Sequence, residues 1–247
     1  PGGTAILNAD DPRVAALADT VDHQVVFFGS GDRARVRAGR IRLTDAGTAF
    51  RLTTPSGETA VTLATPARVM VTNALAAAAA GEVMGVRLNL IKAGLEAYSP
   101  QAGRMGIRRL GRGIDLLDDS YNANPGSMAA AIDTLVSMRG DRRAIAVLGD
   151  MLELGPQSAI LHRDIGRVVG DAGIDRLYVA GQFASDVADG AMQRRMKPDQ
   201  IFTGTKQAII DRLDNQLHPG DLVLVKGSRG MAMEQVVDAI SQWAGKP

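Results

Sequence analysis

The sequence contains no cysteine, few aromatic residues and no long hydrophobic run. The absence of cysteine from all 247 residues excludes disulfide bonds and thiolate metal ligands, and it is typical of a reducing compartment. Aromatic residues make up only 4% of the chain, which disfavours a surface that stacks nucleic-acid bases. The longest apolar run, ALAAAAA at 74–80, is far too short to span a membrane. We therefore expect a cytoplasmic protein without membrane insertion.

An excess of charge of one sign is also lacking. The 28 Lys and Arg residues and the 27 Asp and Glu residues leave a formal net charge of +1 at pH 7. This balance provides no general field that would attract nucleic acid or an anionic membrane surface. What the chain does contain, 45% hydrophobic and 22% charged residues, is typical of a globular protein with a sizeable core. We expect a monomer with no nucleic-acid partner.

The first part of the chain combines parallel and antiparallel patterns. Short buried strands are predicted at 4–8 and 24–29, with a helix between them. Three alternating segments separated by turn signals, at 35–44, 48–54 and 58–64, then predict an antiparallel meander. Helices are predicted at about 68–84 and 88–97. The sequence begins PGGTAILN, without Met, and enters a strand pattern at once, so we expect a segment of a longer protein.

After the loop SPQAG at 99–103 the pattern changes to regular alternation. Five strand-like segments are each followed by a helix-like segment, and the strands fall at 114–120, 144–150, 176–181, 200–204 and 221–227. Such alternation predicts a parallel, doubly wound sheet with right-handed crossovers. We therefore place a domain boundary near residue 102, which gives domains of residues 1–102 and 103–247.

Three strand ends of the second domain are unusually polar. They carry DDSYNANPGS at 118–127, GDMLELG at 149–155 and KGSRG at 226–230. Ligands of open parallel sheets bind outside the carboxyl ends of the strands. Asn124 before Pro125 also suits a helix cap and first turn, which is a purely structural interpretation. That interpretation leaves the rest of the first loop, with its two carboxylates, Tyr121 and Asn122, unexplained.

The chemistry of these loops indicates a nucleotide and a second anionic ligand. A carboxylate at a strand end can accept hydrogen bonds from ribose hydroxyls, and the helix that begins after Asn124 offers free N–H groups to an anion. Lys226 and Arg229, on a Gly-rich turn, suit a phosphate or a carboxylate.

The common phosphate-binding motifs are absent or misplaced. A P-loop requires G-x-x-x-x-G-K-[ST], and the single Gly-Lys pair of the sequence, at 245–246, is followed by Pro247. The segment GSGDRA at 29–34 formally matches G-x-G-x-x-A, but the residues after it alternate like a strand. A dinucleotide motif needs a helix there, so we interpret this match as fortuitous.

No metal site is predicted. The histidines, His23, His162 and His218, are scattered without metal-ligand spacing, and the pattern favours a structural role for His162. The pair Asp10-Asp11 before Pro12 follows a strand, where a cap and turn is favoured over a metal site.

Taken together, the motifs resemble the Mur ligase family. DDSYNANP, LGDMLELG and VLVKGSRGMAMEQVV, in this order, are similar to its C-terminal domain, and LNADDP at 7–12 and NALAAAAAG at 73–81 are similar to its central domain. The resemblance covers the whole chain and is strongest to the member that adds D-alanyl-D-alanine to UDP-N-acetylmuramoyl-tripeptide. It implies an ATP-dependent amide ligase of peptidoglycan synthesis that uses Mg²⁺. It also implies the fold class, an incomplete α/β central domain followed by a Rossmann-like, mostly parallel sheet domain.

The resemblance also implies roles for individual residues. On the nucleotide side, Asp119 would bind the ribose, Asn73 would lie near the adenine and Arg104 would reach the ATP phosphates. Tyr121, Asn122 and Asn124 would lie beside the nucleotide and the incoming dipeptide. The dipeptide side would include Lys226, Ser228 and Arg229, and Arg104 and Lys226 would take part in catalysis. One departure is that Val69-Met70 stand where the family usually has His-Asn.

Two alternatives stay open at this point. The chain could belong to a sister Mur ligase or a folylpolyglutamate-type ligase, although the LGDMLELG and KGSRGMAM loops favour the dipeptide enzyme. It could instead be a noncatalytic module that binds a nucleotide or a peptide, which would fit the missing P-loop.

Overall fold

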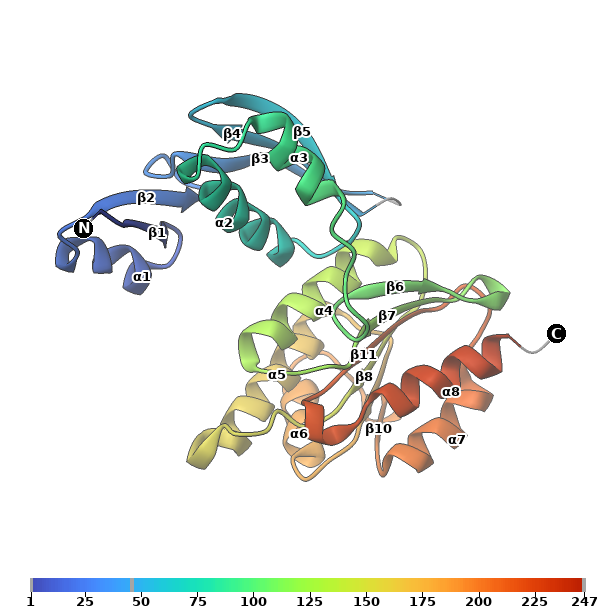
Figure 1. Cartoon of the computed structure of the whole chain (residues 1–247). Helices are drawn as coiled ribbons and strands as arrows, with labels where there is room; N and C mark the ends of the chain where they lie inside the picture. The colour runs from blue at the N-terminus through green and yellow to red at the C-terminus, as the bar shows by residue number, and fades with distance from the viewer. Residues whose placement is uncertain (1, 45–46, 246–247) are drawn as a thin grey trace. The chain divides into compact units, whose positions relative to one another are not determined.

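The computed structural model describes residues 2–44 and 47–245. The chain divides into two compact units, Pro1–Ser99 and Pro100–Pro247 (Figure 1). The division lies close to the expected boundary near residue 102. Both units are built from strands and helices, and the predicted α/β fold class is confirmed.

The first unit is a five-stranded sheet with helices packed against it. Its strands lie in chain order across the sheet, β1 to β3 run parallel, and β3 to β5 form the predicted antiparallel meander. The strands are β1 (Thr4–Asn8), β2 (Gln24–Gly29), β3 (Val36–Thr44), β4 (Gly47–Thr54) and β5 (Gly57–Leu63). Because β3 and not a helix follows GSGDRA, this segment lacks the structure of a dinucleotide-binding motif, as the sequence indicated.

Two helices of this unit bury an apolar face against the sheet. In α2 (Val69–Val83) the buried residues recur at helical spacing, namely Val71, Ala74, Leu75, Ala78 and Ala79. The second helix, α3 (Leu88–Glu96), buries Ile91 and Leu95. The helix predicted between β1 and β2 is shorter than expected and consists of α1 (Pro12–Ala16) and the 3-10 turn Leu17–Thr20.

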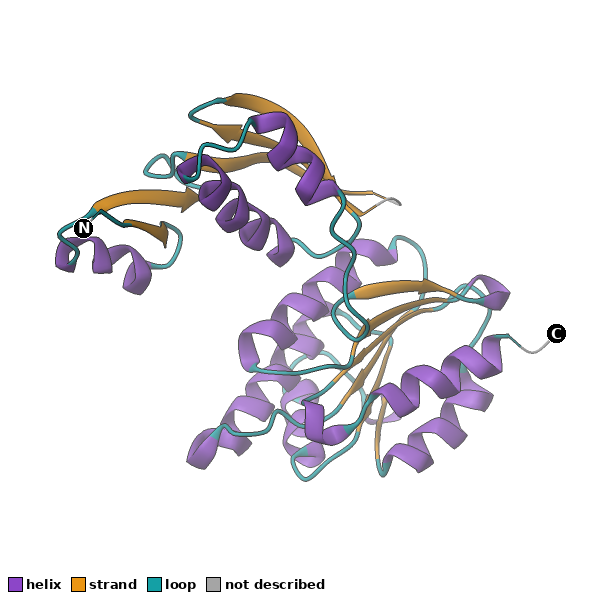
Figure 2. Cartoon of the chain, in the orientation of Figure 1, coloured by secondary structure: helices purple, strands orange, loops and turns teal. Residues whose placement is uncertain are grey.

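The second unit is a six-stranded sheet in the order β10-β9-β8-β11-β7-β6. The five predicted strands are all present and parallel, namely β7 (Asp115–Asp119), β8 (Ala144–Leu148), β9 (Arg176–Val179), β10 (Ile201–Thr203) and β11 (Leu222–Lys226). The helices are α4 (Pro125–Arg139), α5 (Ser158–Ala172), α6 (Ala184–Met192), α7 (Lys206–Gln216) and α8 (Glu234–Ala244). They cover both faces of the sheet (Figure 2).

One strand of this sheet was not predicted. The strand β6 (Gly106–Arg109) pairs antiparallel with β7 at the edge of the sheet. Its sequence, GIRR, is too short and too charged to give an alternating hydrophobic signal. Arg108 of β6 forms an ion pair of 2.7 Å with the Asp118 carboxylate of β7, which adds a side-chain contact to the main-chain pairing of the two strands.

The strand β11 occupies the middle of the sheet, between β7 and β8. The helix after β7 (α4) and the helix after β11 (α8) both contact β11, and they pack on opposite faces of the sheet (Figures 1 and 2). A crevice opens at the carboxyl ends of neighbouring strands whose helices leave on opposite sides. The register places Asp119 of β7, Lys226 of β11 and Leu148 of β8 side by side at this point.

None of the helices in the described ranges is both long enough and apolar enough to cross a lipid bilayer.

Candidate functional site

The two adjacent carboxylates at the end of β7 point to opposite faces of the sheet, because side chains alternate along a strand. Asp118 points to the α8 side, is almost fully buried, and accepts hydrogen bonds from Arg108 Nη2 at 2.7 Å and Ser120 Oγ at 2.6 Å. These partners give Asp118 a structural role. Asp119 points to the other face, the face of α4.

Asp119 is held by two protein donors and keeps a small exposed edge. Its Oδ1 accepts a hydrogen bond from the main-chain N–H of Met105 at 3.0 Å, and its Oδ2 accepts one from Lys226 Nζ at 2.5 Å. The side chain is 15% exposed. The carboxylate is therefore fixed in orientation while one edge stays accessible to a ligand.

Lys226, at the end of β11, is among the most buried charged side chains of the unit. Only 2% of it is exposed, and its ammonium contacts Asp119 and the main-chain oxygen of Asn122, the latter at 2.9 Å. A buried ammonium needs such partners, because leaving it without them costs several kcal/mol, on the order of 3–5. Lys226 thus joins the ends of β7 and β11.

Ser228 connects the three polar loops. Its hydroxyl accepts a hydrogen bond from the Leu152 N–H at 2.9 Å and donates one to the Ala123 oxygen at 3.3 Å. Its own N–H donates to the Asp150 oxygen at 3.0 Å. The prediction that these loops share one rim is confirmed by these contacts.

Two guanidinium groups lie near the ring of Tyr121. The Arg104 guanidinium carbon is 4.2 Å from the ring centroid, and that of Arg229 is 5.8 Å away. Arg229 is 66% exposed and forms a 3.4 Å ion pair with Glu234. Cation–π contacts of this kind hold arginines in place without neutralising them. The rim therefore presents two positive charges beside an exposed aromatic ring.

The segment before β6 is clamped onto the end of β7. Gly103 adopts a φ of +74°, its oxygen accepts the Tyr121 N–H at 2.9 Å, and an added Cβ would lie 3.0 Å from the Tyr121 nitrogen. Met105 has a φ of 53° and is buried. The Met105 N–H, which donates to Asp119, was not predicted from the sequence. A main-chain donor leaves no pattern in the sequence, and the neighbouring Gly103 was the single available hint.

The side chains of the two asparagines of the first loop form hydrogen bonds with the nearby main chain. Asn124 caps α4, with its Oδ1 accepting the Ser127 N–H at 2.8 Å and the Ser127 hydroxyl accepting the Asn124 N–H at 3.0 Å. Asn122 is exposed, and its Oδ1 accepts the N–H of Ala123 at 2.9 Å. The cap predicted for Asn124 is confirmed by this geometry. The free N–H groups at the start of α4 lie at the same rim as Asp119.

In the second loop, the buried polar groups have structural roles. Asp150 is buried and accepts the N–H groups of Gln182 and Phe183 at 2.7 and 3.1 Å, just before α6. His162 is also buried, accepts the Met151 N–H at its Nε2, and stacks on Phe183 with ring centroids 4.6 Å apart. The structural role predicted for His162 is confirmed.

Asn73 lies in the first unit, as the fifth residue of α2. Its amide donates to the Met70 sulfur at 3.5 Å, and it borders a groove of about 430 Å³ between α2 and α3. The groove is otherwise apolar, with Tyr98 and Leu90 among its lining residues. Val69, where the family usually has His, is exposed at the start of α2.

The acidic pair near the start of the chain is structural as well. Asp11 caps α1 through the N–H groups of Arg13 and Val14. Asp10 accepts the Ser30 N–H at 2.8 Å and its hydroxyl at 3.0 Å. Within the described ranges, 2–44 and 47–245, no group of three or more His, Asp or Glu side chains is arranged to hold a metal ion.

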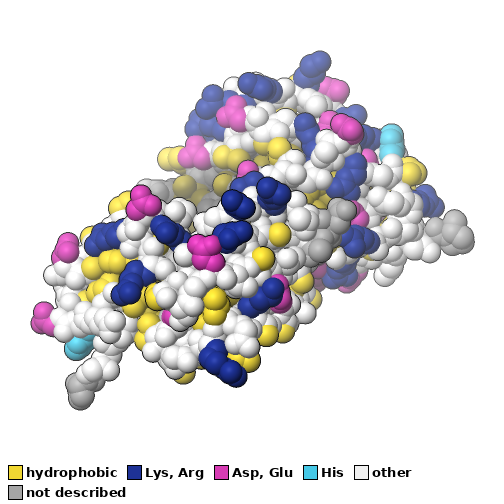
Figure 3. All heavy atoms as spheres, turned by 90° about the horizontal axis from the view of Figure 1, so that it is seen from above, with side chains coloured by type: hydrophobic (Ala, Val, Ile, Leu, Met, Phe, Trp, Pro, Cys, Tyr) yellow, Lys and Arg dark blue, Asp and Glu magenta, His cyan; other side chains and the backbone are white. Residues whose placement is uncertain are grey.

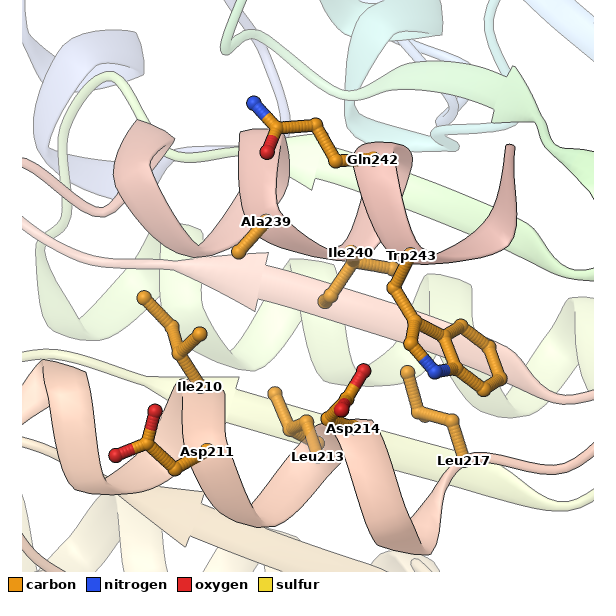
Figure 4. Close-up of a pocket in the computed structure, with 9 residues that line it drawn as sticks. All are labelled: Ile210, Asp211, Leu213, Asp214, Leu217, Ala239, Ile240, Gln242 and Trp243. Carbon is orange, nitrogen blue, oxygen red and sulfur yellow. The ribbon is translucent and has the colours of Figure 1, made fainter. Parts of the chain in front are cut away.

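Other features of the second unit lie away from this rim. A groove of about 250 Å³ runs between α7 and α8, where Trp243 and the carboxylates of Asp211 and Asp214 surround an apolar floor (Figure 4). Burial raises the pKa of Asp221, but Asp221 precedes β11 and so lies at the other end of that strand from Lys226. Neither feature includes a residue of the polar loops.

Charges of both signs are interspersed on the face of the molecule seen in Figure 3. This distribution agrees with the formal net charge of +1.

Known proteins match both units of the chain. The sequence pattern of the Mur ligase middle domain matches residues 1–81, and that of the Mur ligase glutamate ligase domain matches residues 103–229. The UDP-N-acetylmuramoyl-tripeptide–D-alanyl-D-alanine ligase of Escherichia coli K12 is 38% identical over 244 residues, which cover 97% of this chain and 52% of that protein.

Solved structures match as well. MurF from Acinetobacter baumannii superposes with a TM-score of 0.86 at 31% identity, over 98% of this chain and 52% of that one. MurF ligase from Thermotoga maritima in complex with ADP has a TM-score of 0.81 at 22% identity, over 98% of this chain and 54% of that one. The chain spans about half the length of the curated relatives it matches. Because sequence patterns of the Mur ligases match both units, the chain belongs to the Mur ligase family.

Proposed function

We propose that this chain provides the nucleotide and acceptor side of an ATP-dependent ligase that adds D-alanyl-D-alanine to UDP-N-acetylmuramoyl-tripeptide. The proposal takes this reaction from the name of the Escherichia coli relative, which is 38% identical. The observation in this chain that carries it is the Asp119 carboxylate, fixed at the carboxyl ends of β7 and β11 with an accessible edge. Residues 1–102 would be the second part of the central ATPase domain and residues 103–247 the C-terminal ligase domain.

The chemistry of such a ligase starts from a poor electrophile. An amine cannot expel oxygen from a carboxylate, so transfer of a phosphoryl group from ATP first makes an acyl phosphate, which the dipeptide amine then attacks. A protein accelerates these steps chiefly by positioning the reactants and neutralising phosphate charge. The residues of this chain would contribute binding and orientation.

On the nucleotide side, Asp119 would accept the ribose hydroxyls. Arg104 would meet the phosphates, and its stacking on Tyr121 keeps the guanidinium charge available. Asn73 would contact the adenine from the first unit. The N–H groups at the start of α4, after Asn124, suit an anionic group of either substrate.

On the acceptor side, Arg229 is the side chain best suited to a carboxylate, because it is exposed and its ion pair with Glu234 is long. Ser228 would act by holding the three loops together. Asn122 would act through its main-chain oxygen, which Lys226 contacts. We further propose that the protein works as a cytoplasmic monomer.

The residues present fit the nucleotide better than they fit a metal ion. Mg²⁺ in phosphate-transfer sites is usually bound by one or two carboxylates together with substrate phosphates and water. Asp119 is already engaged by two donors, and the described residues offer no cluster of acidic ligands. If Mg²⁺ takes part, its protein ligands would come mostly from outside the described residues, with the ATP phosphates supplying the rest.

The proposed ribose contact can be tested with Asp119→Asn in the full-length gene product. The amide keeps the shape and one acceptor oxygen but removes the negative charge. The loss of charge weakens hydrogen bonds by roughly 1–1.5 kcal/mol, so the dissociation constant for ATP should rise about tenfold. Calorimetric titration measures this constant directly.

The matched control for this test is Asp115→Asn. Asp115 lies on the same face of the same strand but at its amino end, where it pairs with Arg142 at 2.6 Å. ATP affinity should stay at the parent value in this variant. Equal affinities of the parent and Asp119→Asn would remove Asp119 from the ribose site.

The relatives also bear on the alternatives. The match to a D-alanyl-D-alanine ligase at 38% identity favours the dipeptide as acceptor over the substrates of sister or folylpolyglutamate-type ligases. Comparing D-alanyl-D-alanine with other candidate amines in a turnover assay of the full-length product separates these activities. A noncatalytic module would give no turnover with any of them.

A further inference from the structure

We propose that Lys226 is a positioning residue for Asp119 and does not contact the dipeptide. The inference rests on the proposed function, since it assigns Lys226 to the nucleotide side of that ligase. Family resemblance alone implied a role in catalysis and on the dipeptide side. The surroundings of Lys226 point instead to a side chain that orients another one.

The sheet topology brings the two residues together. Lys226 is the last residue of β11 and pairs in register with Asp119, the last residue of β7. Both side chains lie on the same face of the sheet, so the ammonium and the carboxylate meet at 2.5 Å. The insertion of β11 beside β7 therefore creates this pair.

The ammonium has little capacity left for a ligand. Two of its three hydrogens are directed to Asp119 and to the Asn122 oxygen, and only 2% of the side chain is exposed. A substrate carboxylate would have to enter a buried position and compete with Asp119 for the same charge. Arg229, by contrast, is 66% exposed on the same loop.

The arrangement leaves Asp119 suited to two hydroxyl groups. Each carboxylate oxygen has two lone pairs, and each accepts one protein donor, Met105 N–H on Oδ1 and Lys226 on Oδ2. One lone pair on each oxygen remains, and the side chain keeps a 15% exposed edge. Two acceptors side by side match the neighbouring hydroxyls of a ribose.

The same ammonium holds the loop that follows β7. Through the Asn122 oxygen it restrains residues 120–124, which carry the Tyr121 ring. Removing the ammonium should therefore loosen the nucleotide side first. A contact with the dipeptide would instead weaken the acceptor side first.

The experiment compares ATP with 2′,3′-dideoxyATP in the full-length gene product. In the parent, loss of the two hydroxyls should raise the Michaelis constant for the nucleotide about tenfold or more. In Lys226→Met, the ratio of the two constants should fall to about threefold or less, because Asp119 is no longer held. The Michaelis constant for D-alanyl-D-alanine should change less than that for ATP.

Two further variants serve as controls for Lys226→Met. Lys206→Met removes another lysine near the same loop, one that contacts the Met231 and Ala232 oxygens but not Asp119, and it should keep the parent ratio. Lys226→Arg retains the charge and should fold even where the Met variant does not. Its larger guanidinium should displace Asp119 and give a ratio between those of the parent and Lys226→Met.

The outcomes are distinct. A Lys226→Met or Lys226→Arg enzyme that keeps the parent ratio but binds D-alanyl-D-alanine several-fold more weakly would overturn the inference and return Lys226 to the acceptor side. A parent enzyme that uses both nucleotides equally would remove the proposed ribose contact itself. That failure shows in the unsubstituted enzyme and so cannot be confused with a failure of the role given to Lys226.

Discussion

At the scale of single residues, two adjacent acids have opposite surroundings. Asp118 is buried against Arg108 and Ser120, whereas Asp119 contacts Lys226 and keeps one edge of its carboxylate exposed. The sequence shows only DD at a strand end, and alternation along β7 separates the two. The polar loop could thus be predicted from the sequence, but which carboxylate was accessible depended on the resemblance.

The partners of Lys226 were beyond sequence reasoning for a related reason. They depend on the pairing of β11 with β7, two strands that are far apart in the chain. The alternating pattern predicts each strand but not which strands are neighbours. An accessible lysine and a buried lysine look the same in KGSRG.

The same pair affects how Asp119 should be probed. Asp119→Ala would leave the buried ammonium without its carboxylate, which costs on the order of 3–5 kcal/mol of folding free energy. A loss of ATP binding in that variant would then mix unfolding with the loss of a contact. Asp119→Asn keeps one acceptor oxygen for Lys226 or for the Met105 N–H, but its NH2 group then faces the other donor and the ammonium loses its counter-charge. The folding free energy of this variant is therefore measured together with its ATP binding.

Arg229 gives a prediction for the acceptor side. Arg229→Ala in the full-length enzyme should raise the Michaelis constant for D-alanyl-D-alanine about tenfold, since a charge-assisted hydrogen bond contributes roughly 1.5–3 kcal/mol. The constant for ATP should change much less. Steady-state kinetics with each substrate varied in turn provides the comparison.

Glu234→Gln is the matched variant, because it removes the 3.4 Å ion pair and leaves Arg229 in place. Its dipeptide constant should equal or fall below that of the parent. Equal increases for ATP and dipeptide in Arg229→Ala would indicate a structural role on Tyr121 instead.

At the scale of elements, the helices α5 and α6 pack unusually closely. A Cβ on Gly166 of α5 would lie 2.0 Å from the Val187 oxygen, and one on Gly190 of α6 would lie 2.0 Å from the Arg163 oxygen. Such distances are far below contact, so the two glycines set the separation of the helices. Helical periodicity predicted both helices, but their spacing arises from residues that a hydrophobic pattern ignores.

Gly166→Ala should therefore destabilise the second unit. Forcing α5 and α6 apart costs about 1–3 kcal/mol, although alanine is the better helix former. Urea unfolding of the 247-residue chain, followed by circular dichroism, should show a lower midpoint.

Gly126→Ala in α4 is the control, since an added Cβ there meets its nearest atom at an ordinary 3.6 Å. Its midpoint should match or exceed that of the parent. A Gly166→Ala chain as stable as the parent would show that α5 can shift at no cost.

At the scale of the whole molecule, each unit has a core of its own. That of the first unit gathers around β4 and α2, and in the second unit a cluster lies between the sheet and the helices α7 and α8. The opposite face of that sheet is buried as well, by residues such as Met128 and Leu135 of α4 and Val169 of α5. The change of sequence pattern near residue 102 indicated this organisation. The edge strand β6 and the central position of β11 escaped prediction, because the first lacks a hydrophobic pattern and the second depends on long-range pairing.

The 247-residue chain should not release phosphate from ATP. Its sequence has no G-x-x-x-x-G-K-[ST] loop to surround the reacting phosphate, and phosphoryl transfer depends on groups placed there. ATP binding should be weak or undetectable. A phosphate-release assay with the tripeptide substrate and D-alanyl-D-alanine should match the blank without enzyme.

The full-length gene product, assayed in parallel, should turn over. The 247-residue chain would contradict this prediction if it released phosphate in proportion to its concentration and still did so after repurification. The reacting phosphate would then be bound by residues to which we assign other roles.

The central place of β11 has a consequence for how the protein is made. During synthesis β7 and β8 emerge long before the strand that joins them, since the chain from Leu148 to Lys226 needs on the order of 4–16 s at roughly 5–20 residues per second. Throughout that interval the facing edges of β7 and β8 lack their partner strand. Edges of this kind pair readily with other chains. The nascent second unit should therefore depend on chaperones until Lys226 has left the ribosome.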